Sequence, residues 1–286
     1  MKRSIAFLII LINGLTVHSQ ESYIDSVLSE VMYYDDNELL YMDIDKDKTY
    51  HFIYTNATYS NKTFYAGREV ANPQYYLASQ VSYFNSSGFF MGLGISSGTW
   101  FASNGDASYN NAIMLGYGKA LNKHKWLRYN LSYSRFFGIS EGLDFSSTYA
   151  NNAHLGIGLK HKWIGARAGL NFLFGNESKA TFGWNIYSQL SLWNLGQFNN
   201  IKLEPQVSFF YDSEEVMADN QNWDEINYNN EFGRMNTELN LPLMINLNDF
   251  DIELAYTINL PRSLDPNYAY DTTSFFTISV GYIIEL

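Results

Sequence analysis

The sequence lacks two features that would place it in common protein classes. Its 286 residues include no cysteine, which excludes disulfides, thiolate metal sites, a cysteine nucleophile and a lipid-bearing N-terminal cysteine. Long apolar runs are also scarce. Mean hydropathy is -0.22, and the single such run stands at the extreme N-terminus, which excludes a helical protein with several membrane spans. Hydrophobic residues still make up 46% of the chain, so disorder as the dominant state is excluded.

Aromatic residues are abundant instead. The chain has 23 tyrosines and 20 phenylalanines although it is acidic and polar on average. Soluble proteins of this size rarely need so many, whereas transmembrane β-barrels place aromatic residues in girdles at both membrane interfaces. The composition therefore favours a membrane protein that crosses the bilayer with strands.

The first 19 residues predict a secretory signal peptide. Lys2 and Arg3 form its basic start, residues 5–17 its apolar stretch, and Val17 and Ser19 the small residues before a cleavage site after Ser19. The alternative, a membrane anchor, would need more than these 13 apolar-rich residues. The mature chain is thus expected to be exported.

Two acidic segments stand out in the mature chain, whose 16 basic and 29 acidic residues exclude nucleic acid as a partner. Residues 21–49 carry nine acids and two lysines, with apolar residues at helical spacing, and are interpreted as a short periplasmic helix or plug, or as a disordered tail. Residues 212–233 carry seven acids and no base. They are interpreted as a solvated loop, or as a site for divalent cations or a partner, although they lack the spacing of a calcium loop.

From residue 50 onward, apolar residues alternate with small or polar ones, which is the pattern of strands with one apolar face. The clearest example closes the chain, where apolar residues occupy every second position from Phe276 to Leu286. Twelve strands are predicted, at residues 50–64, 74–84, 89–101, 109–120, 126–138, 152–162, 164–174, 181–193, 201–211, 234–246, 250–260 and 274–286.

The links between these strands indicate how they are arranged. Tight turns at 85–88, 122–125 and 247–249 alternate with longer links at 139–151, 212–233 and 261–273. Short turns on one side and long loops on the other are typical of an outer-membrane barrel. A soluble β-sandwich, the alternative, would have to bury glycine, serine, asparagine and charge. The predicted fold class is therefore all-β: a transmembrane up-and-down antiparallel β-barrel of about 12 strands at residues 50–286, after an acidic periplasmic segment at residues 20–49.

Aromatic residues near the ends of these strands are predicted to be interfacial anchors. They are Tyr54, Tyr83, Trp100, Tyr133, Trp163, Trp184 and Tyr211.

The end of the chain resembles the C-terminal assembly signal of Gram-negative outer-membrane β-barrel proteins. The matching positions are Ser279, Gly281, Ile284 and Leu286, with leucine last where an aromatic residue is usual. The cysteine-free, aromatic-rich and asparagine-rich composition also resembles uncharacterised outer-membrane proteins of the Bacteroidota. The resemblance implies an outer-membrane location, recognition by the barrel-assembly machinery, and contact with membrane lipid and lipopolysaccharide.

Charged residues are predicted to face the lumen in its periplasmic half, if the chain enters the barrel from the periplasm. Arg128, Lys160, Arg167 and Lys202 would form a basic wall. Glu204, Asp251, Glu253 and Glu285 would form an acidic wall. Opposite charges across a narrow aqueous constriction create a transverse field that orients polar or zwitterionic solutes. The alternative is that these groups pair and close the lumen.

Catalytic and metal-binding patterns are missing from the sequence. The mature histidines are His51, His124, His154 and His161, and none is followed two residues later by serine or preceded by aspartate. Outer-membrane phospholipases and omptin-type proteases resemble their own families through such pairs. We expect no enzyme, no catalytic residue, no metal and no cofactor.

The leading hypothesis is an outer-membrane barrel that forms a narrow channel for small polar solutes. The first alternative is a plugged barrel that acts as a structural scaffold or binds a surface or periplasmic protein partner. The second is an outer-membrane hydrolase.

Overall fold

The structure is a computed structural model that describes residues 50–62, 64–65, 68–69, 76–98, 108–121, 126–138, 149–194, 199–217 and 228–286. The predicted signal peptide at 1–19, the acidic segment at 20–49 and the predicted turn at 122–125 lie outside the described residues. No helix in this part of the chain is long and apolar enough to cross a membrane.

Sixteen strands form in the described residues. They are β1 (His51–Ser60), β2 (Phe64–Tyr65), β3 (Arg68–Glu69), β4 (Tyr76–Asn85), β5 (Phe89–Gly98), β6 (Ser108–Ala120), β7 (Leu127–Gly138), β8 (Asn151–His161), β9 (Ile164–Phe174), β10 (Ser178–Ser188), β11 (Leu190–Asn194), β12 (Asn199–Leu203), β13 (Gln206–Met217), β14 (Tyr228–Leu247), β15 (Phe250–Pro261) and β16 (Thr273–Glu285).

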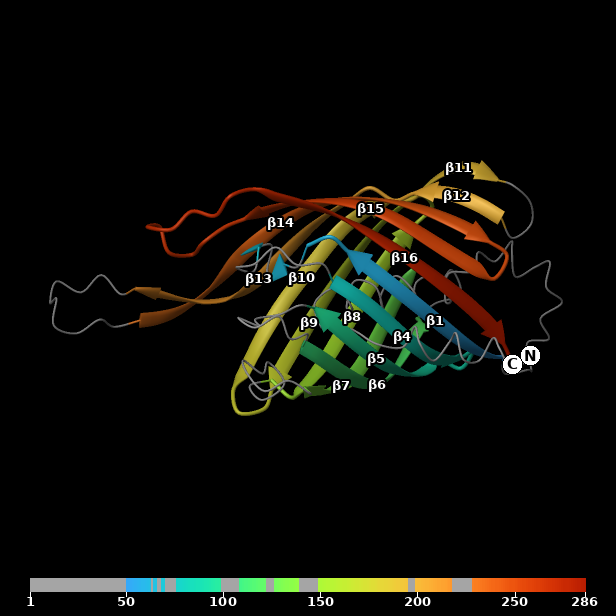
Figure 1. The fold of residues 1–286 in the computed structure, drawn as a ribbon, viewed down its shortest axis with the longest axis horizontal. Coiled ribbons are helices and arrows are strands. Elements are labelled where there is room, and N and C mark those ends of the chain that lie inside the picture. The colour runs from blue at the N-terminus through green and yellow to red at the C-terminus, as the bar shows by residue number, and fades with distance from the viewer. Residues whose placement is uncertain are drawn as a thin grey trace, which may run out of the picture.

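All except β2 and β3 join one antiparallel sheet that closes on itself (Figure 1). The first and last strands meet, with Phe52 opposite Glu285 and Ser60 opposite Thr277. Strand β11 continues β10 after Gln189, and β12 leads into β13 across Glu204 and Pro205, where proline lacks an N–H for the ladder. Counting each continued pair as one, the barrel has twelve strands, and the predicted fold class is confirmed.

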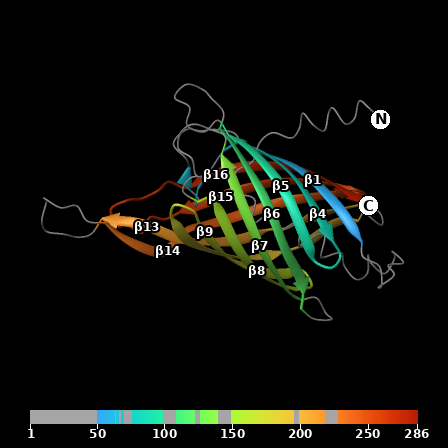
Figure 2. The same cartoon turned by 90° about the horizontal axis from the view of Figure 1, so that it is seen from below.

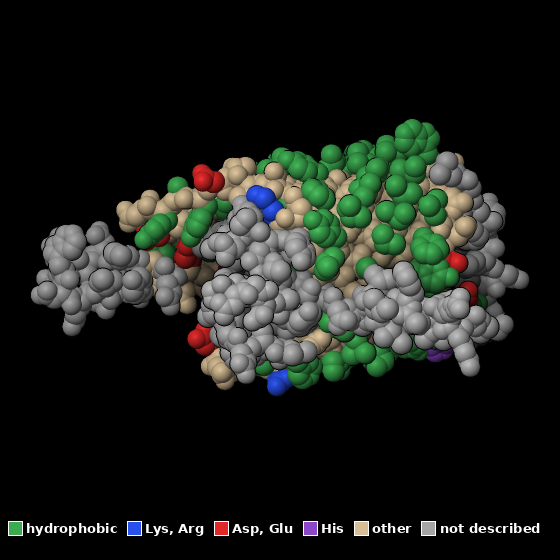
Figure 3. Space-filling model, viewed as in Figure 1, with side chains coloured by type: hydrophobic (Ala, Val, Ile, Leu, Met, Phe, Trp, Pro, Cys, Tyr) green, Lys and Arg blue, Asp and Glu red, His purple; other side chains and the backbone are tan. Residues whose placement is uncertain are grey.

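Side chains alternate between the two faces of this closed sheet. Large hydrophobic residues are exposed on the outside, for example Met91, Leu93 and Leu115, and Figure 3 shows such side chains covering the barrel. The residues at the alternate positions of these strands point into the barrel. Many of them are polar and buried, for example Gln80, Ser82 and Asn130. Because the ring leaves no backbone edge unpaired, this surface suits lipid, and the barrel is transmembrane.

Three of the turns between described strands use left-handed backbone positions, one of them at Lys162 between β8 and β9, with a φ of 54°. Gly88, in the turn between β4 and β5, has a φ of 106°, which L side chains rarely adopt. Its amide donates to the Asn85 carbonyl at 2.9 Å, as expected for the tight turn predicted there. Asn248 takes a φ of 53° in the turn between β14 and β15.

Residues 212–217 and 228–233 of the predicted loop 212–233 are strand, which corrects the sequence-based boundary. Strands β13 and β14 stay paired beyond the barrel, from Asp212 opposite Gly233 to Met217 opposite Tyr228. They form a hairpin that projects from one end of the barrel (Figures 1 and 2). Backbone pairing carries strand structure through an acidic segment whose sequence shows little alternation.

A second segment packs against this hairpin. The Glu214 carboxylate on β13 accepts hydrogen bonds from the Leu264 amide at 2.6 Å and the Ser263 hydroxyl at 3.3 Å. Tyr270 adds a longer hydroxyl contact at 3.5 Å. The Glu214 carboxylate therefore ties the link between β15 and β16 to the hairpin, and the Arg262 amide adds a backbone hydrogen bond to the Met235 carbonyl at 2.7 Å.

One of the seven predicted interfacial aromatic residues lies elsewhere. Tyr54 is 4% exposed and faces the lumen, because it shares the face of the buried Asn56 and Ser60. A Cβ atom added at Gly281, on the neighbouring β16, would overlap the Tyr54 ring. In contrast, Trp163 is 59% exposed. Trp100 lies outside the described residues.

Candidate functional site: the polar lumen

Seven of the eight charged residues predicted for the lumen lie on inward-facing positions of their strands. The eighth, Glu204, lies between β12 and β13. Arg128 and Glu204 are buried. Lys160, Arg167, Lys202, Asp251 and Glu253 are partly buried, and Glu285 is exposed at the end of β16.

The order of strands around the ring shows how these charges are distributed. The basic residues come from β7, β8, β9 and β12, and the acidic residues come from the β12–β13 junction, β15 and β16. Together with β10, β11 and β14, which lie between them, these strands form one continuous run around the ring from β7 to β16, which leaves out only β1, β4, β5 and β6 of the barrel strands. The charges therefore follow one arc, and their sign changes on a single strand, between Lys202 and Glu204.

Contacts along this arc join several of its members. The Arg167 guanidinium forms an ion pair with Glu204 at 3.1 Å between Nη2 and Oε1. Lys160 donates to Gln189 Oε1 at 2.6 Å. Asn246 donates to Asp251 Oδ1 at 2.9 Å. The arc is thus partly neutralised by local pairing along the wall.

The Arg167 guanidinium also contacts an aromatic ring. Its guanidinium carbon lies 4.0 Å from the centre of the Tyr187 ring, which is 2% exposed. The Tyr187 ring in turn covers Gly165 on β9. Glycine is required there, since a Cβ atom would overlap the ring.

Replacing Gly165 with alanine is therefore expected to destabilise the barrel by about 1–3 kcal/mol through overpacking. The matched control is Gly183→Ala, because a Cβ atom at Gly183 meets only the Phe209 carbonyl oxygen at 3.8 Å. Urea midpoints of the refolded variants measure the difference. Equal midpoints for the two variants would show that the Tyr187 ring moves aside freely.

The other side of the lumen carries no ionised group on its described inward positions. Strands β1, β4, β5 and β6 contain one residue of the Lys, Arg, Asp and Glu types, Lys119, and it is exposed on the outside. Their inward residues include Ser82, Ser96 and Phe90, all fully buried. The charged arc thus faces a neutral wall.

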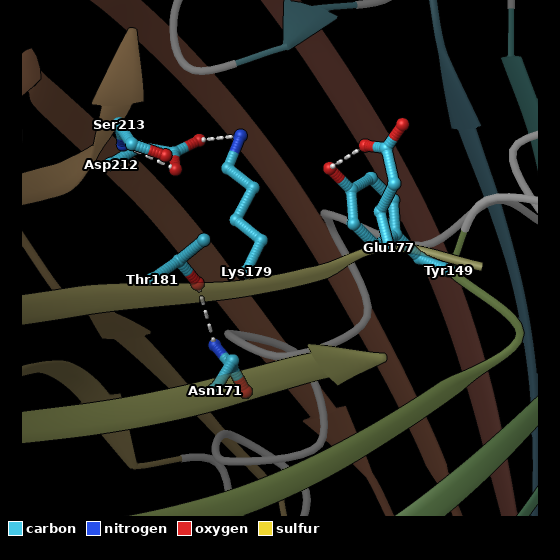
Figure 4. A network of polar contacts seen from close by, with 7 residues as sticks. All are labelled: Tyr149, Asn171, Glu177, Lys179, Thr181, Asp212 and Ser213. Carbon is cyan, nitrogen blue, oxygen red and sulfur yellow. Dashed lines mark hydrogen bonds and ion pairs between the residues drawn. The ribbon is translucent and has the colours of Figure 1, made fainter. Parts of the chain in front are cut away.

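A second buried ion pair lies nearer the end from which the hairpin projects (Figure 4). Lys179 Nζ on β10 lies 2.6 Å from Asp212 Oδ2 on β13, and Asp212 is fully buried. Asp212 also accepts from the Ser213 amide at 2.6 Å. The sequence analysis missed this pair because the predicted strands began at 181 and ended at 211, so both residues fell in assumed loops.

Neutral hydrogen bonds connect the buried polar residues of β8, β9 and β10. The Asn171 carbonyl oxygen lies 2.7 Å from His154 Nδ1, and its amide donates to Thr181 at 3.4 Å. His154 therefore lies in a network of side-chain amides.

At the rim, the Tyr149 hydroxyl donates to the Glu177 carboxylate at 3.3 Å. Burial, together with this carboxylate, raises the pKa of the Tyr149 phenol.

Metal-ligand clusters of three or more His, Cys, Asp or Glu residues are absent from the described residues.

Glu238, on an inward position of β14, is a further lumen carboxylate that the sequence analysis missed. It stands opposite the inward-facing Asn259 on β15, so strand alternation alone would have found it.

The four positions of the C-terminal signal divide between the two faces of β16. Ser279 is buried and its hydroxyl contacts Thr58, while Gly281 lies beneath Tyr54. Ile284 and Leu286 are exposed on the outside, at 40% and 67%.

No family model matches the chain, and no curated protein matches it. Among solved structures, it is similar to the KdgM porin in complex with disordered oligogalacturonate, at 10% identity and a TM-score of 0.43 over 82% of this chain and 98% of that one. The NanC porin gives 9% identity and a TM-score of 0.44, over 81% and 98% of the two chains. The translocator domain of autotransporter NalP from Neisseria meningitidis gives 11% identity and a TM-score of 0.38, over 92% and 97%.

Proposed function

We propose that this chain is an outer-membrane β-barrel that forms a narrow channel for small polar solutes. The observation that carries the proposal is a closed ring of twelve strands with an apolar outside and an inside lined by amides, hydroxyls and a charged arc. Eight-stranded barrels are filled by their own side chains, whereas sixteen-stranded ones are open. A barrel of intermediate width with a polar lining suits a restricted aqueous path.

Small and large residues share the inward positions of the neutral wall. Gly92 and Gly94 on β5 and Gly116 and Gly118 on β6 alternate with the buried rings of Phe84 and Phe90, so this wall narrows the proposed path without adding charge. The charged arc across from it supplies groups that interact with a polar solute. We propose that Arg128, Lys160, Arg167 and Lys202, with Glu204, Asp251, Glu253 and Glu285, set its selectivity.

A second candidate function is a plugged barrel that binds a protein partner. The β13–β14 hairpin favours it, because Glu214 fixes the neighbouring segment against strands that extend beyond the barrel. In either case we propose export through the signal peptide at 1–19, recognition of the C-terminal positions by the barrel-assembly machinery, and an outer-membrane location in contact with lipid and lipopolysaccharide.

The test is single-channel recording from residues 20–286, refolded and inserted into a planar bilayer, beside a version that lacks residues 20–49. Steady conductance steps from the first protein are expected if the lumen conducts. Steps from the shorter version alone would identify residues 20–49 as a plug. Silence from both, with heat-modifiable migration confirming the folded barrel, would contradict the channel and favour the partner-binding scaffold.

A further inference from the structure

Two buried asparagines form an amide pair on the inner wall of β14 and β15. Asn236 Nδ2 donates to Asn259 Oδ1 at 3.0 Å, and the residues are 4% and 1% exposed. The other two amide atoms, Asn236 Oδ1 and Asn259 Nδ2, are buried and have no hydrogen-bond partner among the described residues. A buried polar atom without a partner costs about 1–3 kcal/mol.

The pair offers one donor and one acceptor whichever way the two amides are oriented. If both side chains are turned over, Asn259 donates to Asn236, and the remaining atoms are again one NH₂ group and one carbonyl oxygen. A hydroxyl group complements this couple because it both accepts and donates a hydrogen bond.

Neighbouring side chains extend the patch. Glu238 lies directly opposite Asn259 in the ladder and supplies a carboxylate that accepts further hydroxyl groups. Phe210 lies opposite Asn236 on β13 and supplies an aromatic ring on the same inner face. Its apolar face suits the C–H surface of a sugar ring. Polar groups at fixed positions beside an aromatic surface are the usual composition of a small-molecule site.

The charge of the patch selects among hydroxyl-bearing solutes. Residues 236–247 of β14 and all of β15 contain no Lys or Arg, and Glu238 is negative when ionised. An anionic sugar would meet this carboxylate, and the one base on these two strands, Arg234 on β14, is exposed opposite Tyr211.

We propose that Asn236, Asn259, Glu238 and Phe210 form a subsite for a neutral sugar within the lumen. The inference rests on the proposed channel, since the sugar would reach the patch through it. The amide pair orients one hydroxyl, Glu238 accepts from another, and Phe210 covers the apolar face of the ring.

The test is calorimetric titration of the refolded barrel with maltotriose and with glucuronate, in a detergent without a sugar headgroup. Maltotriose is expected to bind at least tenfold more tightly than glucuronate. Asn259→Leu should weaken maltotriose binding by tenfold or more. The control, Asn171→Leu, changes a buried inward amide on β9 that already contacts His154 and Thr181, and it should leave binding unchanged.

A second variant, Glu238→Gln, keeps the side-chain size and removes the charge. It should reduce the discrimination against glucuronate while the barrel keeps its heat-modifiable migration. Equal loss of binding in the Asn259 and Asn171 variants would overturn the subsite.

Conductance of the same preparations separates the two proposals. A protein that conducts ions and binds no maltotriose would refute the subsite and leave the channel standing. A protein that binds maltotriose with the expected variant pattern and does not conduct would refute the channel and keep the subsite.

Discussion

Replacing Lys179 with methionine is expected to lower the free energy of unfolding by about 3–5 kcal/mol. Lys179 lies 2.6 Å from the Asp212 carboxylate, which is fully buried, so the substitution leaves a carboxylate without its cation in a place that water does not reach. Removing one partner of a buried pair costs more than the pair itself contributes, because the remaining ion keeps its desolvation penalty. The urea midpoint of the refolded barrel, followed by tryptophan fluorescence, measures the loss.

A double variant and a surface variant serve as controls. Lys179→Met combined with Asp212→Asn removes both charges and is expected to recover most of the stability, since the amide leaves no buried ion. Lys119→Met makes the same substitution at an exposed position on β6 and should cost less than about 1 kcal/mol. A Lys179 variant as stable as the Lys119 variant would show that Asp212 finds another partner or becomes protonated.

Most of the barrel follows from strand alternation. Along β5, the exposed Phe89, Met91 and Leu93 alternate with the buried Phe90 and Gly92, and the sequence shows this period directly. The requirement that lipid-facing backbone be fully hydrogen-bonded then converts a row of such strands into a closed ring. For this reason the predicted strand ranges differ from the observed ones mostly at their ends.

The features that were missed lie where pairing overrides the local pattern. Strands β13 and β14 continue through the acidic 212–217 and 228–233 because each supplies the other with backbone partners, and a single sequence does not show this pairing. That error, together with a predicted start of β10 at residue 181, also concealed the pair of Lys179 and Asp212. Tyr54 was placed at the interface because its position near a strand end was weighed above the alternation of β1.

The charged residues also show which features strand alternation predicts and which depend on strand pairing. Their inward positions follow from alternation, but whether they oppose or adjoin one another depends on the order of strands around the ring. In an up-and-down barrel that order is the chain order, so the strands from β7 to β16 form one continuous run, in which only β10 separates β9 from the β12–β13 junction. The ion pair of Arg167 with Glu204 follows from this proximity.

Two neutralising substitutions of opposite sign are expected to shift ion selectivity in opposite directions. Lys202, which acts electrostatically on Asp251, favours anions, so Lys202→Gln should make the channel more selective for cations. Glu253, close to Glu204 and Arg167, favours cations, so Glu253→Gln should make it more selective for anions. A unit charge about 10 Å from a passing ion contributes roughly 0.4–1.7 kcal/mol at dielectric constants of about 80 to 20, a factor of about 2 to 17 in the permeability of that ion.

Reversal potentials across a KCl gradient near 0.1 M measure this ratio, with Lys119→Gln on the outer surface as the matched control. At about 1 M salt, where the Debye length falls to about 3 Å, both shifts should shrink. General damage to the barrel would move both variants in the same direction, whereas a field from the charged arc moves them apart. Shifts of the same sign, or none beyond the control, would show that ions pass the arc without sensing it, and the channel's selectivity would then have to arise elsewhere in the lumen.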